Sequence, residues 1–250
     1  MGGGQGTRLG SAQPKGLFNV GLPSGKSLLQ IQAERLMRLQ HLAQEKFGKC
    51  PPIPWYIMTS EATDELTEQF FAKNNFFGLD RNAVRFFEQG RYPSLLEDGK
   101  IAMSSRCGIS LSPNGNGGIY EAVHRNNILA ELKSKGVEYI FVYGVDNIAI
   151  RVCDPVFIGL LKAEHGDCGV KVVPKDYPAE RVGVVAYRNN APSVVEYSEL
   201  DPGTAQKVDQ LTGKLIFNTG NICTHLYTYD FLQRSCEKLR LRRKGKKFGV

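Results

Sequence analysis

The amino-acid sequence predicts an α/β protein whose mostly parallel, twisted sheet is flanked by helices. Apolar, strand-like runs alternate along the chain with amphipathic, helix-like runs, and no internal repeat interrupts the alternation. Several of the strand-like runs, such as YIFVYG, are apolar at every position, which is typical of strands buried on both faces. The 250 residues, 42% hydrophobic and 23% charged, suffice for one large domain of ordinary globular composition.

Local signals place the elements of the first half of the chain. A helix is expected over residues 27–48, because leucine and alanine recur at helical spacing between the N-cap residue Ser27 and the helix-ending Gly48. The other elements expected here are helices over 62–75 and 117–136, strands over 54–60, 84–90 and 139–147, and a hairpin over 95–103 that turns at Asp98-Gly99.

The second half continues the alternation. We expect a helix over 155–165, strands over 168–173, 182–187 and 193–199, and a further apolar segment over 215–227. The glycine-rich opening and the motifs FEQG, NGNGG and VDN each occur where a strand ends or a helix begins. Ligands of parallel sheets bind beyond the carboxyl ends of the strands. These four segments are therefore expected to converge on one crevice.

The positive charge of the chain is concentrated at its C-terminal end. The formal net charge is +7, and from Arg234 onward there are eight basic residues and one acidic residue, so this end accounts for the whole excess. We divide the chain into a core over 1–233 and a basic tail over 234–250, expected to be non-native or disordered. The core has no basic stripe, which argues against a nucleic-acid partner; a nucleic-acid binder acting through the tail is the weakest alternative.

The cysteines and the apolar runs indicate the compartment. The six cysteines are scattered and form no CxxC pair, which favours reduced thiols in a cytoplasmic protein. No apolar run is long enough to span a bilayer and no secretory signal is visible, so no membrane partner is expected.

The opening, GGGQGTRLGSAQPKG, is suited to a polyphosphate. Glycines let backbone N–H groups approach an anion closely, while Arg8 and Lys15 add positive charge and Pro14 restricts the chain just before Lys15. The pattern is neither GxGxxG nor GxxxxGK[ST], so a dinucleotide fold and a P-loop ATPase fit poorly. The alternative interpretation is a flexible glycine-rich leader.

Two further residues have chemistry that suits a nucleotide. Asp146 follows an apolar strand and can hold Mg²⁺ while phosphates complete the coordination shell, although a turn-capping aspartate is the alternative. Gln89 offers a donor and an acceptor that match the imide edge of uracil, but from the residues alone a plain surface glutamine is the preferred interpretation.

A set of motifs in order along residues 1 to about 233 resembles the eukaryotic UDP-N-acetylhexosamine (UDP-GlcNAc) pyrophosphorylases. The motifs include GGQGTRLG, PKG, QIQAER, PWYIMTS, FFEQG, NGNGG, VGVV, VEYSE and FNTGNI. The resemblance implies a nucleotide-diphospho-sugar transferase core (GT-A/Rossmann-like) over 1–233. It also implies a uridylyltransferase that joins UTP and N-acetylglucosamine 1-phosphate, releasing UDP-N-acetylglucosamine and pyrophosphate with Mg²⁺ (or Mn²⁺). GlcNAc is not distinguished from GalNAc.

The resemblance also assigns roles to individual residues. It implies that Arg8 and Lys15 are catalytic, that Gly3, Gly4, Gly6, Thr7, Gln89 and Gly115 bind the nucleotide, that Asn116, Gly183, Glu196 and Asn221 bind the sugar, and that Asp146 binds the metal. Two alternatives stay open: a uridylyltransferase with another sugar preference, such as glucose 1-phosphate, and an inactive nucleotide-sugar-binding homologue.

The chain also departs from the family pattern. The signature loop of the family follows a buried strand, and the family continues beyond NICTHLYTYDFL with a sugar-phosphate lysine and a C-terminal domain. The resemblance therefore implies a core that is incomplete at both ends, with a sheet that lacks one central strand and has an open edge. We expect this chain alone to be weakly active or inactive, and the full-length enzyme is a candidate homodimer.

Overall fold

The computed structural model describes the backbone of residues 13–245 and the side chains of residues 13–239. The α-helices are α1 (Leu28–Phe47), α2 (Asp64–Lys73), α3 (Ile119–Arg125), α4 (Ile128–Ser134), α5 (Pro155–Ala163), α6 (Pro202–Ala205) and α7 (Tyr229–Gly245). Short 3₁₀ helices are η2 (Lys15–Leu17), η3 (Asn75–Gly78), η4 (Arg81–Ala83) and η5 (Asn116–Gly118).

Strands alternate with these helices. They are β1 (Trp55–Thr59), β2 (Val84–Glu88), β3 (Arg91–Pro93), β4 (Met103–Ser105), β5 (Gly108–Ile109), β6 (Leu111–Pro113), β7 (Tyr139–Val142), β8 (Cys168–Pro174), β9 (Val184–Arg188), β10 (Ala191–Val195) and β11 (Thr219–Thr228). The mixed α/β class predicted from the sequence is confirmed. Among residues 13–245, every helix is too short or too polar to cross a membrane.

The prediction of a mostly parallel sheet is wrong for the largest sheet. This sheet has the order β10-β9-β11-β7, with β8 also paired to β11, and all of these pairs are antiparallel. Parallel pairing within the described residues is confined to β1 and β2. The reason lies in the connections, because β9 turns directly into β10 and β8 reaches β9 without a crossover helix, whereas parallel strands need such a crossover.

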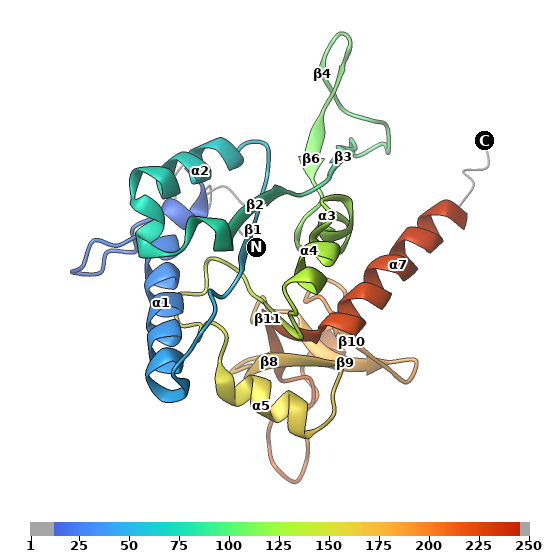
Figure 1. Cartoon of the computed structure of the whole chain (residues 1–250). Coiled ribbons are helices and arrows are strands. Elements are labelled where there is room, and N and C mark those ends of the chain that lie inside the picture. The colour runs from blue at the N-terminus through green and yellow to red at the C-terminus, as the bar shows by residue number, and fades with distance from the viewer. Residues whose placement is uncertain (1–12, 246–250) are drawn as a thin grey trace.

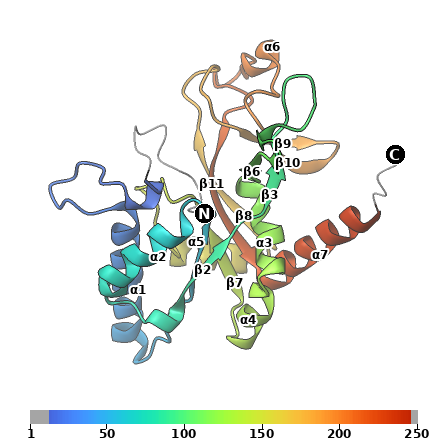
Figure 2. The ribbon, with the colours of Figure 1, turned by 90° about the horizontal axis from the view of Figure 1, so that it is seen from above.

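Apolar strand runs are explained by helices on both faces. Trp55 and Ile57 of β1 belong to a core with α1, whereas Met58 belongs to a second core with α3, α4 and α7. Figures 1 and 2 show α1 and α2 on one side of β1 and β2, and α3, α4 and α7 on the other. Because successive side chains of a strand point to opposite faces, a strand between two helical layers must be apolar at every position.

A cavity of about 170 Å³ lies between β1 and β7. Consecutive residues of both segments line it, from 53 to 58 and from 139 to 143, so it opens onto the edges of these strands and not onto one face. Within residues 13–245, β1 pairs only with β2, and β7 pairs only with β11.

The two ends of α1 lie at the capping residues from which the sequence predicted them. The Ser27 side chain accepts a hydrogen bond from the backbone N–H of Gln30, at 3.2 Å, and Gly48 adopts a left-handed conformation, as predicted for the two ends of α1. The helix predicted over 117–136 is instead broken into α3 and α4 at Asn127, whose φ is +57°. Asparagine tolerates this conformation better than most residues.

The expected hairpin is present, and the C-terminal segment is largely helical. The backbone N–H of Gly99 bonds to the carbonyl of Leu96 at 2.9 Å, within an arm of short strands that projects from the body (Figure 1). Helix α7 continues through Gly245, so most of the segment 234–250 is helical. Whether this segment is native stays a prediction, and residues 246–250 lie outside the described residues.

Asp154 at the start of α5 is expected to stabilise the fold. Its carboxylate accepts from the backbone N–H of Val156 at 3.1 Å and pairs with Lys171 Nζ at 2.5 Å, and the residue is 8% exposed. The hydrogen bond from Lys171 holds the pKa of Asp154 below its ordinary value. We expect Asp154→Ala to lower the free energy of unfolding by about 2 kcal/mol at pH 7, because both the helix cap and the ion pair are lost.

Unfolding at acidic pH tests the contact between Asp154 and Lys171. A carboxyl whose pKa is lower in the folded state stabilises the protein above its unfolded pKa of about 4, and this contribution is lost as the pH falls through the folded pKa. In urea unfolding at pH 7 and at about pH 3, the difference between the parent and Asp154→Ala should therefore shrink at the lower pH. An undiminished difference would contradict an electrostatic origin.

Candidate active site

Lys15 and Asp146, predicted from separate motifs, meet in the structure. Lys15 opens η2 and Asp146 lies in the turn after β7, and Lys15 Nζ is 3.5 Å from Asp146 Oδ2. Their side chains are 26% and 60% exposed, respectively. A long, solvent-exposed pair of this kind is weak, so both groups remain available to an incoming anion and a metal ion.

The backbone before Asp146 leaves room for its carboxylate. A Cβ added to Gly144 would lie 2.7 Å from Asp146 Oδ1, so the carboxylate folds back over the glycine. The turn itself is closed by a hydrogen bond from the backbone N–H of Asn147 to the carbonyl of Gly144, at 3.4 Å.

Gln89 is buried, and its side chain has an unused acceptor. It follows β2, is 7% exposed, and its backbone N–H donates to the carbonyl of Thr59 at 2.9 Å. Its Oε1 is buried without a hydrogen-bond partner among the described residues. The alternative of a plain surface glutamine is therefore wrong. Buried polar atoms are nearly always paired, so an unpaired one suggests a ligand.

Gly115 and Asn116 lie beside this glutamine, at the approach to α3. Gly115 has a φ of +72°, which favours glycine, and Asn116 begins η5. The backbone N–H of Asn114 donates to the carbonyl of Gly90 at 3.0 Å, so the loop holding Gly115 contacts the residue that follows Gln89. The structure thus brings Gln89 and Gly115 into one region and places Asn116 there too.

Asn114 is a site residue that the sequence reasoning missed. Its Oδ1 is buried without a hydrogen-bond partner in the described part of the chain, and its Nδ2 donates to Glu121 Oε2 at 3.3 Å. Cβ atoms added to Gly118 and Gly90 would lie 1.8 Å from Asn114 Oδ1 and 2.9 Å from Nδ2. The sequence signal was the pair of glycines that leave space for this side chain.

Three of the four residues assigned to the sugar, Gly183, Glu196 and Asn221, form a second group, and Asn116 lies with Gly115. The backbone N–H of Asn221 donates to the carbonyl of Gly183 at 2.8 Å, and a Cβ on Gly183 would lie 3.3 Å from Glu196 Oε2. A register shift in β11 between Asn221 and Thr224 changes the direction in which the side chains of this part of the strand point. Glycine at 183 therefore keeps open the space between the carboxylate and the bulge.

Cys223 lies beside the sugar group. It lies within the β11 bulge, and its backbone N–H donates to Asn221 Oδ1 at 3.1 Å. Burial raises the pKa of the Cys223 thiol, and the negative charges of Glu196 and Asp146 raise it further. Both carboxylates thus act on the same thiol. Sequence reasoning had no signal for this residue, because its neighbours come together only through the bulge.

The remaining predicted residues are Gly3, Gly4, Gly6, Thr7 and Arg8, which lie outside the described residues. The metal prediction can be tested against the described carboxylates. Residues 13–239 contain no group of three or more His, Cys, Asp or Glu side chains that could hold a metal ion. A single exposed carboxylate at Asp146 fits Mg²⁺, which commonly uses one or two carboxylates with substrate phosphates.

Comparison with known proteins identifies the family. The family model described as UTP–glucose-1-phosphate uridylyltransferase matches residues 1–244. The chain belongs to this family. Within the uridylyltransferase family, it is 49% identical over 233 residues to the UDP-N-acetylhexosamine pyrophosphorylase-like protein 1 of Xenopus tropicalis, covering 93% of this chain and 45% of that protein. It is 43% identical to the UDP-N-acetylglucosamine pyrophosphorylase of Saccharomyces cerevisiae, covering 95% and 49%.

A solved uridylyltransferase-family structure has the same fold. The uridine diphosphate N-acetylglucosamine pyrophosphorylase of Trypanosoma brucei superposes with a TM-score of 0.88 at 35% identity, over 96% of this chain and 48% of that one. The resemblance drawn from the sequence motifs is confirmed. The chain spans about half the length of the relatives that it matches.

Proposed function

We propose that this chain is the nucleotide- and sugar-binding part of a uridylyltransferase that joins UTP and N-acetylglucosamine 1-phosphate to give UDP-N-acetylglucosamine and pyrophosphate. The observation that carries the proposal is the contact between Lys15 and Asp146, a cation and a carboxylate 131 positions apart in the sequence. The names of the relatives from X. tropicalis and S. cerevisiae support the same reaction.

The reaction is an in-line transfer between two anions. An oxygen of the sugar phosphate attacks the α-phosphorus of UTP, the bond from that phosphorus to the bridging oxygen breaks, and pyrophosphate leaves with the electron pair. Little covalent chemistry is required of the protein, which must align the phosphates and offset their repulsion. Lys15 carries fixed positive charge to the α-phosphate and the leaving group, and Arg8 has the same role.

Asp146 is the residue that would hold Mg²⁺ (or Mn²⁺). The ion, when bound, supplies neutralising charge to the triphosphate. With Asp146 engaged by such an ion, Lys15 would be free to contact the phosphates, since the contact between these two residues is long and exposed. No other described carboxylate would be required, because Mg²⁺ commonly takes its remaining ligands from substrate phosphates and water.

The two remaining groups select the base and the sugar. Gln89 and Gly115 read the imide edge of uracil, and Asn116, Gly183, Glu196 and Asn221 contact the sugar and its phosphate. Glu196 accepts from sugar hydroxyls, and the Asn221 amide donates or accepts. Glucose 1-phosphate is the second candidate substrate, because the matching family model is described by that sugar.

We also infer the wider context of the chain. The TM-score of 0.88 supports a nucleotide-diphospho-sugar transferase core of the GT-A/Rossmann-like type. All six cysteines are free, which fits a reducing compartment such as the cytoplasm. A homodimer of the full-length enzyme stays a prediction.

Titration calorimetry with UTP, UDP-N-acetylglucosamine and CTP tests the proposal. We expect both uridine compounds to bind and CTP to bind at least ~10-fold more weakly, because cytosine presents a different donor–acceptor pattern to Gln89. UDP-glucose separates the two candidate sugars. Equal affinity for UTP and CTP would contradict the assignment of Gln89, and failure of every uridine compound to bind would overturn the proposed function.

A further inference from the structure

Two side chains of α1 reach across the core to backbone carbonyls far away in the sequence. Gln32 Nε2 donates to the carbonyl of Val145 at 2.9 Å, and Gln32 is only 1% exposed. Arg35 Nη1 donates to the carbonyls of Ile148 and Ile150, at 2.5 and 3.0 Å. The two residues are three positions apart and thus share one face of the helix.

These three carbonyls lie on both sides of Asp146. Val145 precedes it directly, and Ile148 and Ile150 follow it. The turn's own backbone contacts are long, at 3.4 Å from Asn147 N to the carbonyl of Gly144 and 3.3 Å from Ile150 N to the carbonyl of Asn147. The bonds from α1 are shorter, and those from Arg35 are charge-assisted, so they hold this segment more firmly than its internal contacts.

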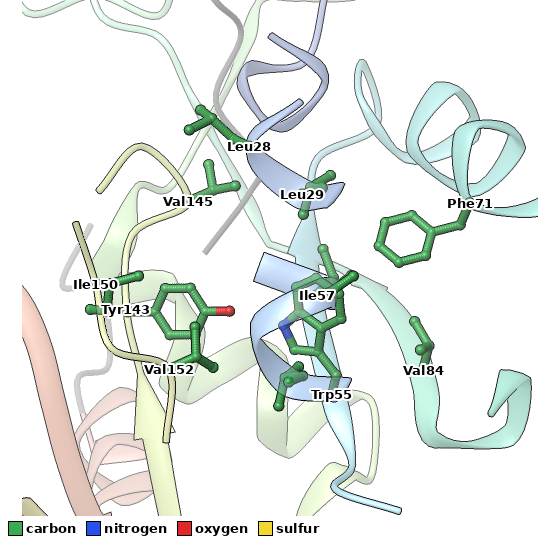
Figure 3. Packing of buried hydrophobic residues seen from close by; sticks show 12 residues of the cluster. Leu28, Leu29, Trp55, Ile57, Phe71, Val84, Tyr143, Val145, Ile150 and Val152 are labelled. Atoms are coloured by element: carbon green, nitrogen blue, oxygen red, sulfur yellow. The ribbon is translucent and has the colours of Figure 1, made fainter. Parts of the chain in front are cut away.

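The same helix contacts the segment that contains Lys15. A Cβ on Gly16 would lie 2.5 Å from Leu29 Cδ1 and 3.4 Å from Val145 Cγ2, so Gly16 packs directly between α1 and the Asp146 turn. Figure 3 shows Leu29 and Val145 among the buried side chains of this core. One rigid helix therefore supports both residues of the Lys15–Asp146 contact.

We infer that Gln32 and Arg35 are positioning residues that fix the Asp146 carboxylate for its divalent cation. The inference rests on the proposed function, in which Asp146 holds that cation. Neither residue touches substrate. Outer partners of a metal ligand act by limiting the positions that the ligand can adopt, and their loss typically weakens metal binding 10- to 100-fold.

The test compares single variants of the chain in Mn²⁺ binding, measured by electron paramagnetic resonance in the presence of UTP. Gln32→Met and Arg35→Met remove the hydrogen bonds but keep apolar bulk, and Arg35→Lys retains a donor. Arg38→Met is the matched control on the same helix, because the Arg38 side chain is 65% exposed and its contact to Glu45 is long, at 3.9 Å. Asp146→Asn reports whether Asp146 is a ligand at all.

We expect Gln32→Met and Arg35→Met to weaken Mn²⁺ binding ~10-fold, Arg35→Lys to weaken it less, and Arg38→Met to leave it unchanged. Hydrogen exchange gives a second readout without any ligand. The amides of residues 147 and 150 should exchange faster in the first two variants, while those of β8 and β11 should not change.

The outcomes separate this inference from the proposed function. If Asp146→Asn weakens Mn²⁺ binding but Gln32→Met and Arg35→Met do not, Asp146 is a ligand and the positioning role is refuted. If Asp146→Asn has no effect, the proposed role of Asp146 itself fails. An equal loss in Arg38→Met, or faster exchange throughout the molecule, would show general loosening and would also overturn the inference.

Discussion

Lys15→Ala should reduce turnover of UTP with the sugar phosphate about 10²- to 10³-fold, the loss typical when one charged donor to a transition state is removed. The lysine stands beside Asp146 at 3.5 Å, so its charge lies next to the site proposed for the metal and the phosphates. Affinity for UTP, measured by calorimetry, should fall as well, and this readout does not depend on how active the chain is. Lys15→Arg should recover part of the loss, because the charge remains although its geometry changes.

This prediction has two controls: the free energy of unfolding of Lys15→Ala, and the substitution of a second lysine, Lys26. The Lys15–Asp146 contact is exposed, so Lys15→Ala should change the free energy of unfolding by less than about 0.5 kcal/mol. Lys26 makes a shorter surface contact, 2.6 Å to Glu34, and lies in the loop before α1. Lys26→Ala should leave turnover and UTP affinity as they are. A Lys15→Ala protein that binds and turns over UTP normally would refute the electrostatic role.

Gln89→Met should lower affinity for UTP about 10- to 100-fold and abolish the preference for UTP over CTP. The preference for UTP over CTP is expected to depend on hydrogen bonds between the Gln89 amide and the edge of the base, and methionine cannot form these bonds. The same substitution should leave the free protein as stable as the parent, or more stable by up to about 1 kcal/mol. The reason is that it removes a buried acceptor, Oε1, that has no partner within the described residues.

A second glutamine gives the matched control. Gln40 is half-buried, and its Oε1 accepts a hydrogen bond from the backbone N–H of Ile53 at 2.6 Å. Gln40→Met should therefore destabilise the protein by about 1 kcal/mol and leave the UTP to CTP preference intact. Thermal or urea unfolding together with calorimetry measures both quantities. A strongly destabilised Gln89→Met variant that keeps its preference for UTP would show that Gln89 is structural.

Local sequence patterns predicted correctly those features of the fold that depend on contacts between neighbouring residues. The ends of α1 follow from the hydrogen bond that Ser27 accepts and from the left-handed Gly48. By contrast, the break between α3 and α4 depends on Asn127 adopting a φ of +57°, which the apolar periodicity of 117–136 did not reveal. A single residue in that conformation ends a helix without disturbing the spacing of its apolar side chains.

The direction of strand pairing could not be predicted from apolar runs. Continuous apolar sequence indicates burial on both faces, and β1 is indeed buried between two groups of helices. Burial does not fix direction, which depends on whether the connection is a helix crossover or a short turn. The strands β8 to β11 have antiparallel partners.

The residues of the candidate site also fall into two sets, those that the sequence selected and those that only the structure revealed. The chemistry of Lys15 and Asp146 and their places at element ends were visible in the sequence, whereas the family resemblance supplied Gln89, Gly115, Glu196 and Asn221. Asn114, Cys223, Gln32 and Arg35 were not selected. The contacts of Asn114, Gln32 and Arg35 span 7 to 115 positions, as in the hydrogen bond from Arg35 to the carbonyl of Ile150.

The sequence by itself therefore determined the class of the fold, the family and the residues with the chemistry for nucleotide binding, since each depends on residue type and on neighbours along the chain. Only the tertiary structure decided that β8 to β11 pair antiparallel, that Gln89 is buried with an unused acceptor, and that α1 holds both sides of Asp146. The physical reason is that burial and hydrogen-bond partnership are properties of the packed chain. They arise when segments far apart in sequence exclude water from one another.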